Sequence, residues 1–348
     1  MALFGLGGKK SRVGLDIGSG LIKLAVVDHS SGEPELTKVA MTPVLADAIV
    51  EGEVMDPGVV TEAIRGLLSS AGVKTKGVAV AVGGRDLIIR KIQVDRMKES
   101  DAYDVIRWEA QQYVPFDIEA VELDFQILDP DSDGLQMDVL LVAAKRELVE
   151  NKITLLSDSG LKAETVDVDA FALHNAFAVN YPEAMEGVCA LVNIGNETTN
   201  VNFVVDGVPL LTRDLNIGTR KFREDLQRGK AMGAEEADEA LRSTEQIPEL
   251  AGYVTTRADE IAIGFERAAA FLQTAGVDAG KVQRFYMSGG GARINGIVEA
   301  LGSRLGVSPE VVNPVQRLKV REGVFDDIEL DEVAPLLLMA IGLGLRQA

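Results

Sequence analysis

Leu15-Asp16-Ile17-Gly18-Ser19-Gly20 is the segment that decides the fold, because a similar segment recurs as Val192-Asn193-Ile194-Gly195-Asn196-Glu197-Thr198-Thr199. When residues 190–199 are laid over residues 13–22, apolar, polar and glycine positions match at a constant offset. A β-branched run follows each copy, so each copy is typical of a strand, a glycine turn and a second strand. The two copies begin the two halves of the chain, and the sequence therefore predicts an internal duplication.

The rest of the chain alternates expected strands and helices. Residues 77–160 contain two strands, a helix, two further strands and a helix, which predicts a small α+β module inserted into a larger domain. Asp169 is expected to cap the helix that follows a strand at 163–168. Further helices are expected at 59–71, 219–228, 235–242, 253–273, 294–305 and 333–345, and further strands at 209–215 and 282–287.

This order of elements predicts an α/β protein in four parts. We expect a flexible tail at 1–11 and the inserted α+β module at 77–160. The first of the two duplicated domains is predicted to comprise 12–76 with 161–187 and 331–348, and the second to comprise 188–330.

The charge balance argues against nucleic acid as a partner. The 348 residues include 35 lysines and arginines against 54 aspartates and glutamates, a formal net charge of −19, and no basic cluster occurs. Any bound phosphate must therefore be held locally, by backbone N–H groups. Cys189 is the single cysteine, which excludes an intramolecular disulfide framework. The longest apolar stretch, 333–345, is too short to span a bilayer, so we expect a cytoplasmic protein without a transmembrane segment.

The turn Gly18-Ser19-Gly20 is the first candidate for binding an anion. Glycines let the backbone approach a ligand closely, and consecutive N–H groups can then converge on phosphate oxygens. The turn is not a dinucleotide fingerprint, because Lys23 stands where the third glycine would be and a strand follows in place of a helix. An ordinary hairpin turn is the alternative.

Asp16 strengthens the case for a ligand at this turn. A carboxylate on a strand beside a phosphate-sized turn can hold a Mg²⁺ ion or its water ligands, and Lys23 adds a positive charge within reach. The alternative is that Asp16 only accepts hydrogen bonds within the turn, because a buried carboxylate without a partner would be costly.

The run Ser288-Gly289-Gly290-Gly291-Ala292-Arg293 is a third candidate. Three successive glycines after an apolar strand add entropy to the unfolded chain, so they need a structural or functional reason. A flat ligand such as an adenosine lying on the backbone is one reason, and close packing of strand against helix is the other.

Together, these motifs resemble those of the actin-like ATPase superfamily. Its phosphate-1 hairpin resembles residues 15–20, its phosphate-2 hairpin resembles 192–199, and its adenosine motif resembles 287–292. The resemblance implies an actin-like fold of two duplicated ribonuclease-H-like domains that bind ATP and Mg²⁺ between them. It implies phosphate contacts from Gly18, Ser19, Gly20, Lys23, Gly195, Asn196, Thr198 and Thr199, nucleoside contacts from Gly218, Gly289, Gly290 and Arg293, and metal contacts from Asp16 and, more weakly, Asn193.

The inserted module restricts this resemblance to fewer families of the superfamily. Actin and the shape-determining filament proteins lack such a block, whereas the cell-division protein FtsA has a similar one, of the SHS2 kind. The segments 106–117 and 166–173 resemble the family of cytoplasmic type IV pilus assembly proteins. That resemblance implies binding of the N-terminal cytoplasmic tail of the membrane protein PilN and contacts with other pilus components. It also implies a peripheral location at the inner membrane through those partners, and it leaves self-association open.

Asn193 departs from the superfamily pattern, in which an aspartate usually helps to organise the metal and the attacking water. A neutral amide cannot accept a proton or balance Mg²⁺ charge as a carboxylate does. We therefore expect ATP binding with slow or absent hydrolysis. Two rival functions are an FtsA-like division protein and a small-molecule kinase of the same fold, although no candidate base stands out beside the phosphate motifs of this chain.

Overall fold

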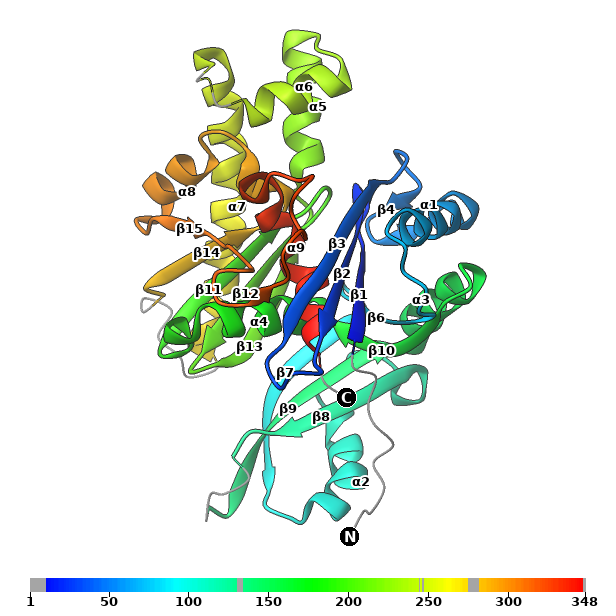
Figure 1. Cartoon of the computed structure of the whole chain (residues 1–348). Helices are drawn as coiled ribbons and strands as arrows, with labels where there is room; N and C mark the ends of the chain where they lie inside the picture. The colour runs from blue at the N-terminus through cyan, green and yellow to red at the C-terminus, as the bar shows by residue number, and fades with distance from the viewer. Residues whose placement is uncertain (1–10, 130–133, 244, 246, 275–281, 347–348) are drawn as a thin grey trace.

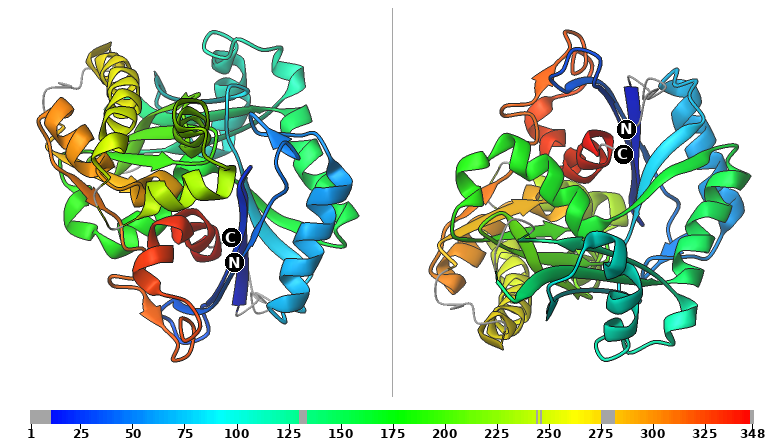
Figure 2. Two further views of the ribbon diagram at one scale, coloured as in Figure 1. Left: turned by 90° about the horizontal axis from the view of Figure 1, so that it is seen from above. Right: turned by 90° about the horizontal axis from the view of Figure 1, so that it is seen from below.

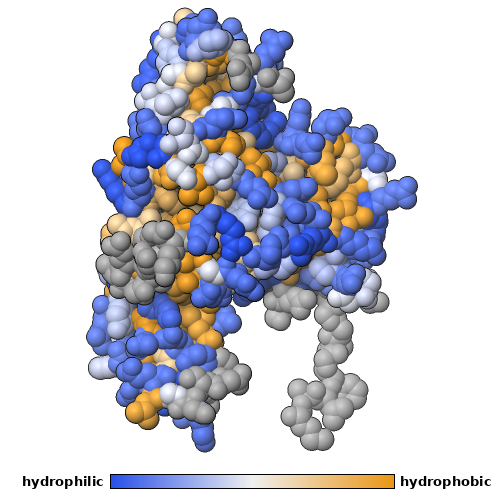
Figure 3. Space-filling view, turned by 90° about the vertical axis from the view of Figure 1, so that its left-hand side faces the viewer, coloured by the Kyte–Doolittle hydropathy of each residue, from blue (hydrophilic) through white to orange (hydrophobic). Residues whose placement is uncertain are grey.

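The computed structural model describes residues 11–129, 134–243, 245, 247–274 and 282–346 (Figure 1). The predicted N-terminal tail therefore lies outside the described residues except for Ser11, which already begins the first strand. None of the helices in the described ranges is both long and apolar enough to cross a bilayer. Hydrophilic side chains cover most of the face shown in Figure 3, with apolar ones in separate groups among them.

The first half of the chain is built on a six-stranded sheet with the order β10-β6-β1-β2-β3-β16. Strands β1, β2 and β3 form an antiparallel meander, and β6 and β10 run parallel to β1. These strands are β1 (Ser11–Ile17), β2 (Leu21–Asp28), β3 (Glu35–Pro43), β6 (Gly77–Val82), β10 (Lys162–Val168) and β16 (Lys319–Val320). A short hairpin of β4 (Ile49–Val50) and β5 (Glu53–Val54) follows β3.

The second half repeats this plan in a five-stranded sheet with the order β13-β12-β11-β14-β15. Strands β11, β12 and β13 form the same antiparallel meander, and β14 runs parallel to β11 as β6 does to β1. In the two leading hairpins, Asp16 pairs with Lys23 and Asn193 pairs with Asn200 at equivalent register positions. The predicted duplication is confirmed. The strands are β11 (Val188–Ile194), β12 (Thr199–Val205), β13 (Val208–Leu215), β14 (Arg284–Ser288) and β15 (Pro309–Val311).

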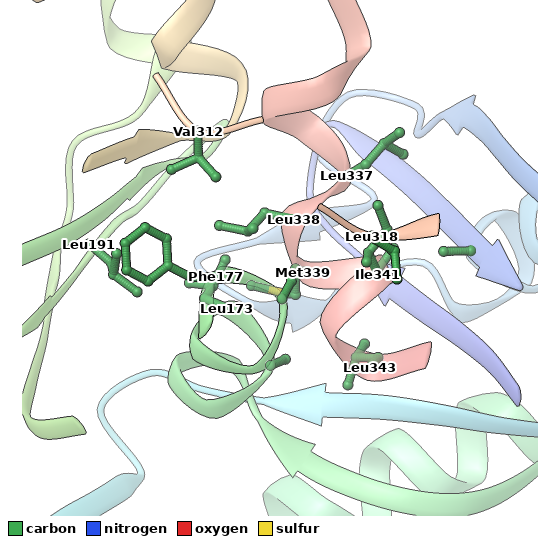
Figure 4. Close-up of a cluster of buried hydrophobic side chains, with 14 of the residues drawn as sticks. Leu173, Phe177, Leu191, Val312, Leu318, Leu337, Leu338, Met339, Ile341 and Leu343 are labelled. Atoms are coloured by element: carbon green, nitrogen blue, oxygen red, sulfur yellow. The ribbon is translucent and has the colours of Figure 1, made fainter. Parts of the chain in front are cut away.

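Two central helices, α4 (Asp169–Asn180) and α9 (Leu330–Leu345), lie between the two sheets (Figure 2). Every residue of α9 from Val333 to Gly344 is buried, as expected for a helix that is apolar around its whole circumference. Figure 4 shows apolar side chains of α9 and α4 meeting one another and Leu191 of the second sheet. The backbones approach so closely that a Cβ on Gly342 would overlap the carbonyl oxygen of Ala172.

The remaining helices cover the outer faces of the two sheets. Helices α1 and α3 bury Ile64, Leu67, Leu155 and Leu156 against the first sheet. Helices α7 and α8 cover the second sheet, and α5 and α6 project beyond it (Figure 1). The bounds are α1 (Pro57–Ser70), α3 (Arg146–Asp158), α5 (Thr219–Lys230), α6 (Ala234–Arg242), α7 (Pro248–Thr274) and α8 (Ile297–Leu305).

The inserted module has its own three-stranded sheet, β7-β9-β8, with α2 (Glu99–Ala110) packed against one face. Its strands are β7 (Leu87–Asp95), β8 (Val121–Ile127) and β9 (Gln136–Lys145). The predicted bounds of 77–160 were too wide. Strand β6 is buried at every residue and lies between β10 and β1, as a central parallel strand does, and α3 packs on the first sheet. Strand β16, predicted with the second domain, likewise pairs with β3.

Candidate functional site

A cavity of about 460 Å³ lies between the two glycine hairpins, with the glycine run after β14 on its wall. It gathers most of the residues that the sequence analysis singled out. These are Asp16, Gly18, Ser19, Gly20, Lys23, Asn193, Gly195, Asn196, Thr198, Gly289, Gly290 and Arg293. Thr199 and Gly218 are not among the residues that line it.

The two hairpin turns face each other across this cavity. A Cβ on Gly20 would lie 3.0 Å from the Cβ of Asn196, and Asn196 Nδ2 donates to Ser19 Oγ at 3.4 Å. Within the described part of the chain, the backbone N–H groups of Ser19, Gly20, Asn196 and Glu197 have no hydrogen-bond acceptor. Two sets of free amide donors therefore point to an acceptor-rich ligand, such as phosphate, between the turns.

Asp16 and Lys23 form an ion pair at the mouth of the first turn. They lie opposite each other on β1 and β2, and Lys23 Nζ donates to Asp16 Oδ2 at 2.6 Å. Both side chains are largely buried, so the pair is poorly screened by solvent. Among the described residues there is no group of three or more acidic, histidine or cysteine side chains that could hold a metal ion. The site fits a Mg²⁺ ion that takes one ligand from Asp16 and the rest from phosphate oxygens and water.

Asn193 belongs to a chain of hydrogen bonds that runs across the second sheet. Its Oδ1 accepts from Ser288 Oγ at 3.1 Å, and its Nδ2 donates to Asn200 Oδ1 at 3.1 Å. Asn200 Nδ2 in turn donates to Asp214 Oδ1 at 2.7 Å. The amide at position 193 therefore uses both its donor and its acceptor, which explains why it is well accommodated here.

Both close packing and an open cavity wall explain the glycines that follow β14. Gly289 has a φ of +82°, and a Cβ there would overlap the carbonyl oxygen of Ile194. A Cβ on Gly291 would overlap the Ile194 side chain, so close packing explains two of the three glycines. Gly290 meets nothing closer than 3.7 Å and lines the cavity, as does Arg293, whose pKa is lowered by burial. The segment Gly290–Arg293 forms a 3₁₀ turn, and α8 begins later than predicted.

Thr199 and Gly218 stabilise the second hairpin turn but do not line the cavity. The Thr199 side chain is wholly buried, and its Oγ1 donates to the carbonyl oxygen of Ile217 at 2.6 Å. Gly218 precedes α5, and a Cβ there would overlap the backbone carbonyl of Asn196. Both residues therefore shape the second turn, and the phosphate and nucleoside contacts expected of them stay predictions.

The sequence analysis missed several charged residues on the cavity wall, among them Lys152, Asp169 and Asp214. Asp169 does not cap α4, because Val168 is the N-cap residue and the Asp169 carboxylate lies against Gly83. Burial lowers the pKa of Lys152 and raises the pKa of Asp214. One signal could have found Asp169. It follows β10, a strand parallel to β1, and the carboxyl ends of parallel strands share one edge of a sheet.

Asp169 predicts a pH dependence of folding stability. Burial raises its pKa from 3.8 to about 7, so the folded chain retains a proton that the unfolded chain has released. The contribution of Asp169 to the free energy of unfolding therefore decreases as the pH rises from 3.8 through about 7. From pH 6 to pH 8 the loss is roughly 1 kcal/mol, and Asp169→Asn should remove it. Urea unfolding at both pH values tests this, and an equal loss in the variant would contradict it.

A set of contacts beside the cavity joins the region of the β4–β5 hairpin to the second half of the chain. We name it the clasp, and its five residues are Asp47, Glu51, Arg85, Glu197 and Arg220. Arg220 at the start of α5 pairs with Asp47 at 2.8 Å and with Glu197 at 3.0 Å. The backbone N–H of Glu51 donates to Glu197 Oε2 at 2.6 Å, and the Glu51 carboxylate pairs with Arg85 at 3.4 Å. Asp47 and Glu51 both have positive φ angles, of 62° and 50°, a backbone conformation that is uncommon for residues other than glycine.

The duplicated sheets, the central helix pair and the cavity between the halves together define an actin-like protein. The ethanolamine utilization protein EutJ from Carboxydothermus hydrogenoformans shares this fold, with a TM-score of 0.60 and 18% identity over 97% of this chain and 90% of that one. MreB5 of Spiroplasma citri bound to ADP matches with a TM-score of 0.52 and 12% identity over 89% of this chain and 94% of that one.

A family model described as "Type IV pilus assembly protein PilM" matches residues 14–348, so the chain belongs to this family of pilus assembly proteins. The structure of a PilM–PilN type IV pilus biogenesis complex agrees with this. Its matching chain superposes with a TM-score of 0.83 and is 29% identical, over 96% of this chain and 98% of that one.

Proposed function

We propose that this pilus assembly protein binds ATP with Mg²⁺ in the cavity between its two halves. The observation that carries the proposal is the pair of facing turns, whose free amide groups lie beside the Asp16–Lys23 ion pair. The similar MreB5 of Spiroplasma citri has been solved with ADP and with AMPPNP, which supports a nucleotide in a fold of this kind.

Each part of the cavity has its own role in this proposal. The turn amides bind phosphate oxygens, Lys23 neutralises part of their charge, and Asp16 supplies the protein ligand to the metal, directly or through water. Gly290 and Arg293 border the nucleoside end, where a side chain at 290 would take up room. The bound Mg²⁺ would shield phosphate charge that the acidic wall of Asp16, Asp169 and Asp214 would otherwise repel.

We further propose that the chain binds the N-terminal cytoplasmic tail of PilN and so is held at the inner membrane as a cytoplasmic protein. The near-complete match to the PilM chain of the PilM–PilN complex supports this partner. An FtsA-like division role is less well supported, because the family match is to pilus assembly proteins. A kinase role is less well supported for the same reason, and the buried Asp169 is the residue on the cavity wall that would have to act as the base.

Hydrolysis in this cavity should be slow, because Asn193 provides no carboxylate next to the phosphate turns. Asn193→Asp is expected to raise the rate of phosphate release from Mg-ATP, measured with a coupled assay at saturating ATP. Asn151→Asp, at an exposed position of α3 outside the cavity, is the control, since it adds the same charge away from the turns. An unchanged rate in Asn193→Asp would show that position 193 does not limit turnover.

The experiment that tests the proposed function is a pair of calorimetric titrations of the full chain. One titrates Mg-ATP, and the other titrates a peptide of the PilN N-terminal tail with and without saturating Mg-ATP. Micromolar binding of both ligands is the expected result. If Mg-ATP does not bind, the turns are inherited structure and the protein works without nucleotide. If the peptide does not bind, the partner proposal is wrong.

A further inference from the structure

A second cavity, of about 650 Å³, opens beside the first and has no role in the function proposed above. It lies between the start of α5, the end of β13 and the middle of α7. Glu51, Gly84, Thr198 and Asp214 line both cavities, so the two share a wall. Its volume falls within the range of roughly 300–1,000 Å³ that is typical of ligand-binding sites.

Three basic and three acidic residues line the second cavity, but two of the basic ones have no partner in the described part of the chain. Lys221 and Arg267 line it, and neither forms an ion pair or a side-chain hydrogen bond within the described ranges of the chain. Arg85 contributes a third cation, which makes only the 3.4 Å contact with Glu51. The other two acidic residues on the wall already have partners, because Glu260 pairs with Arg257 and Asp214 accepts a hydrogen bond from Asn200. Free cations in a concave site are unexpected in a chain with a net charge of −19, in which acidic partners outnumber basic ones.

Apolar side chains stand next to these cations. Leu215 and Ile217 lie on the wall, and Ile263 is 39% exposed one turn before Arg267 on α7. One turn after Arg267, the ring of Phe271 lies under the guanidinium of Arg213 at 5.0 Å and is 51% exposed. The site therefore offers positive charge and apolar surface together along one face of α7.

We propose that the second cavity is a docking site for an acidic, partly apolar segment of a partner protein. Two carboxylates of that segment pair with Lys221 and Arg267, and an apolar side chain between them packs on Ile263. Charge complementarity selects this occupant, because a neutral or basic segment would leave both cations unpaired. A free inorganic anion would use the cations but leave the apolar wall uncovered.

This docking site is distinct from the proposed nucleotide site, with which it shares a wall. An acidic segment would also compete with Glu51 for Arg85, which belongs to the clasp. Occupation of the second cavity would therefore loosen one contact at the mouth of the first. The test below contains no nucleotide, so its failure does not bear on ATP binding, and a failure of ATP binding does not affect it.

The test uses a fluorescein-labelled synthetic peptide of six residues, four glutamates and two leucines, and reads its fluorescence anisotropy against the full chain at low salt. Lys221→Glu and Arg267→Glu are each expected to weaken binding by about tenfold or more. The control, Lys230→Glu, makes the same charge change at an exposed position of α5 outside both cavities and should change the affinity less than twofold.

Three results would overturn the proposal. One is equal weakening by Lys230→Glu, which would mean that only the overall charge matters. Another is displacement of the peptide by sodium phosphate at the peptide's own concentration, which would assign the site to a small anion. The last is undetectable peptide binding by a wild-type chain that circular dichroism shows to be folded.

Discussion

Replacing Gly342 by alanine is expected to destabilise the chain by at least about 3 kcal/mol. Alanine has a higher helix propensity than glycine, so the substitution would stabilise an isolated helix. In α9, however, the added Cβ would overlap the carbonyl oxygen of Ala172, and both atoms belong to rigid backbone. The central helices α4 and α9 would have to separate, which disrupts the core that joins the two sheets.

Gly66→Ala is the matched control for this prediction. Gly66 also lies inside a helix, α1, but a Cβ there meets no atom within 4 Å. That variant should be more stable than the wild type by roughly 0.5–1 kcal/mol, from helix propensity alone. Urea unfolding of both variants decides the matter. If Gly342→Ala were as stable as Gly66→Ala, the close approach of the two central helices would not hold in solution.

Asp16→Asn is expected to abolish the effect of Mg²⁺ on ATP binding. In the wild type, Mg²⁺ should strengthen binding by about tenfold or more, because Asp16 and the phosphates share the ion. The variant loses that ligand, but it also frees Lys23 from its 2.6 Å ion pair. ATP without metal should therefore bind the variant at least as well as the wild type, while added Mg²⁺ no longer improves binding.

This pattern separates a metal-binding role of Asp16 from a structural one. A purely structural role would weaken ATP binding equally with and without Mg²⁺, and that outcome would contradict the assignment. Calorimetric titrations with ATP in EDTA and with Mg-ATP give the two affinities. Asp327→Asn, at an exposed acidic position, is the control and should keep the Mg²⁺ dependence of the wild type.

The duplicated hairpins could be predicted because their signal is local. A strand, a glycine turn and a β-branched strand leave a pattern within ten residues, and that pattern occurs twice. The bounds of the inserted module could not be predicted in the same way. Strand β6 adjoins β7 in sequence, and only long-range pairing with β1 and β10 assigns it to the first sheet. Strand β16 is two residues long and has too little pattern to predict its pairing with β3.

The candidate site was predictable where glycines mark the turns and was missed where single charges enter from other elements. Lys152 comes from α3 and Asp214 from β13, and neither belongs to a motif. Asp169 was visible but was interpreted as a helix cap, because an aspartate after a strand and before a helix fits both roles. Thr199 and Gly218 were predicted as phosphate and nucleoside contacts, whereas in the structure they pack against the second turn and do not line the cavity.

The clasp has a consequence for how long the first cavity keeps an occupant. Its ion pairs are partly solvated, and such pairs contribute only about 1 kcal/mol or less each. These contacts are therefore weak, and raised ionic strength should loosen them and shorten the residence time of a molecule bound in the cavity. Because the five residues come from four separate segments, any partner that shifts one segment should also change the rate of exchange. Surface contacts of the chain would thus set how fast a molecule exchanges in the cavity.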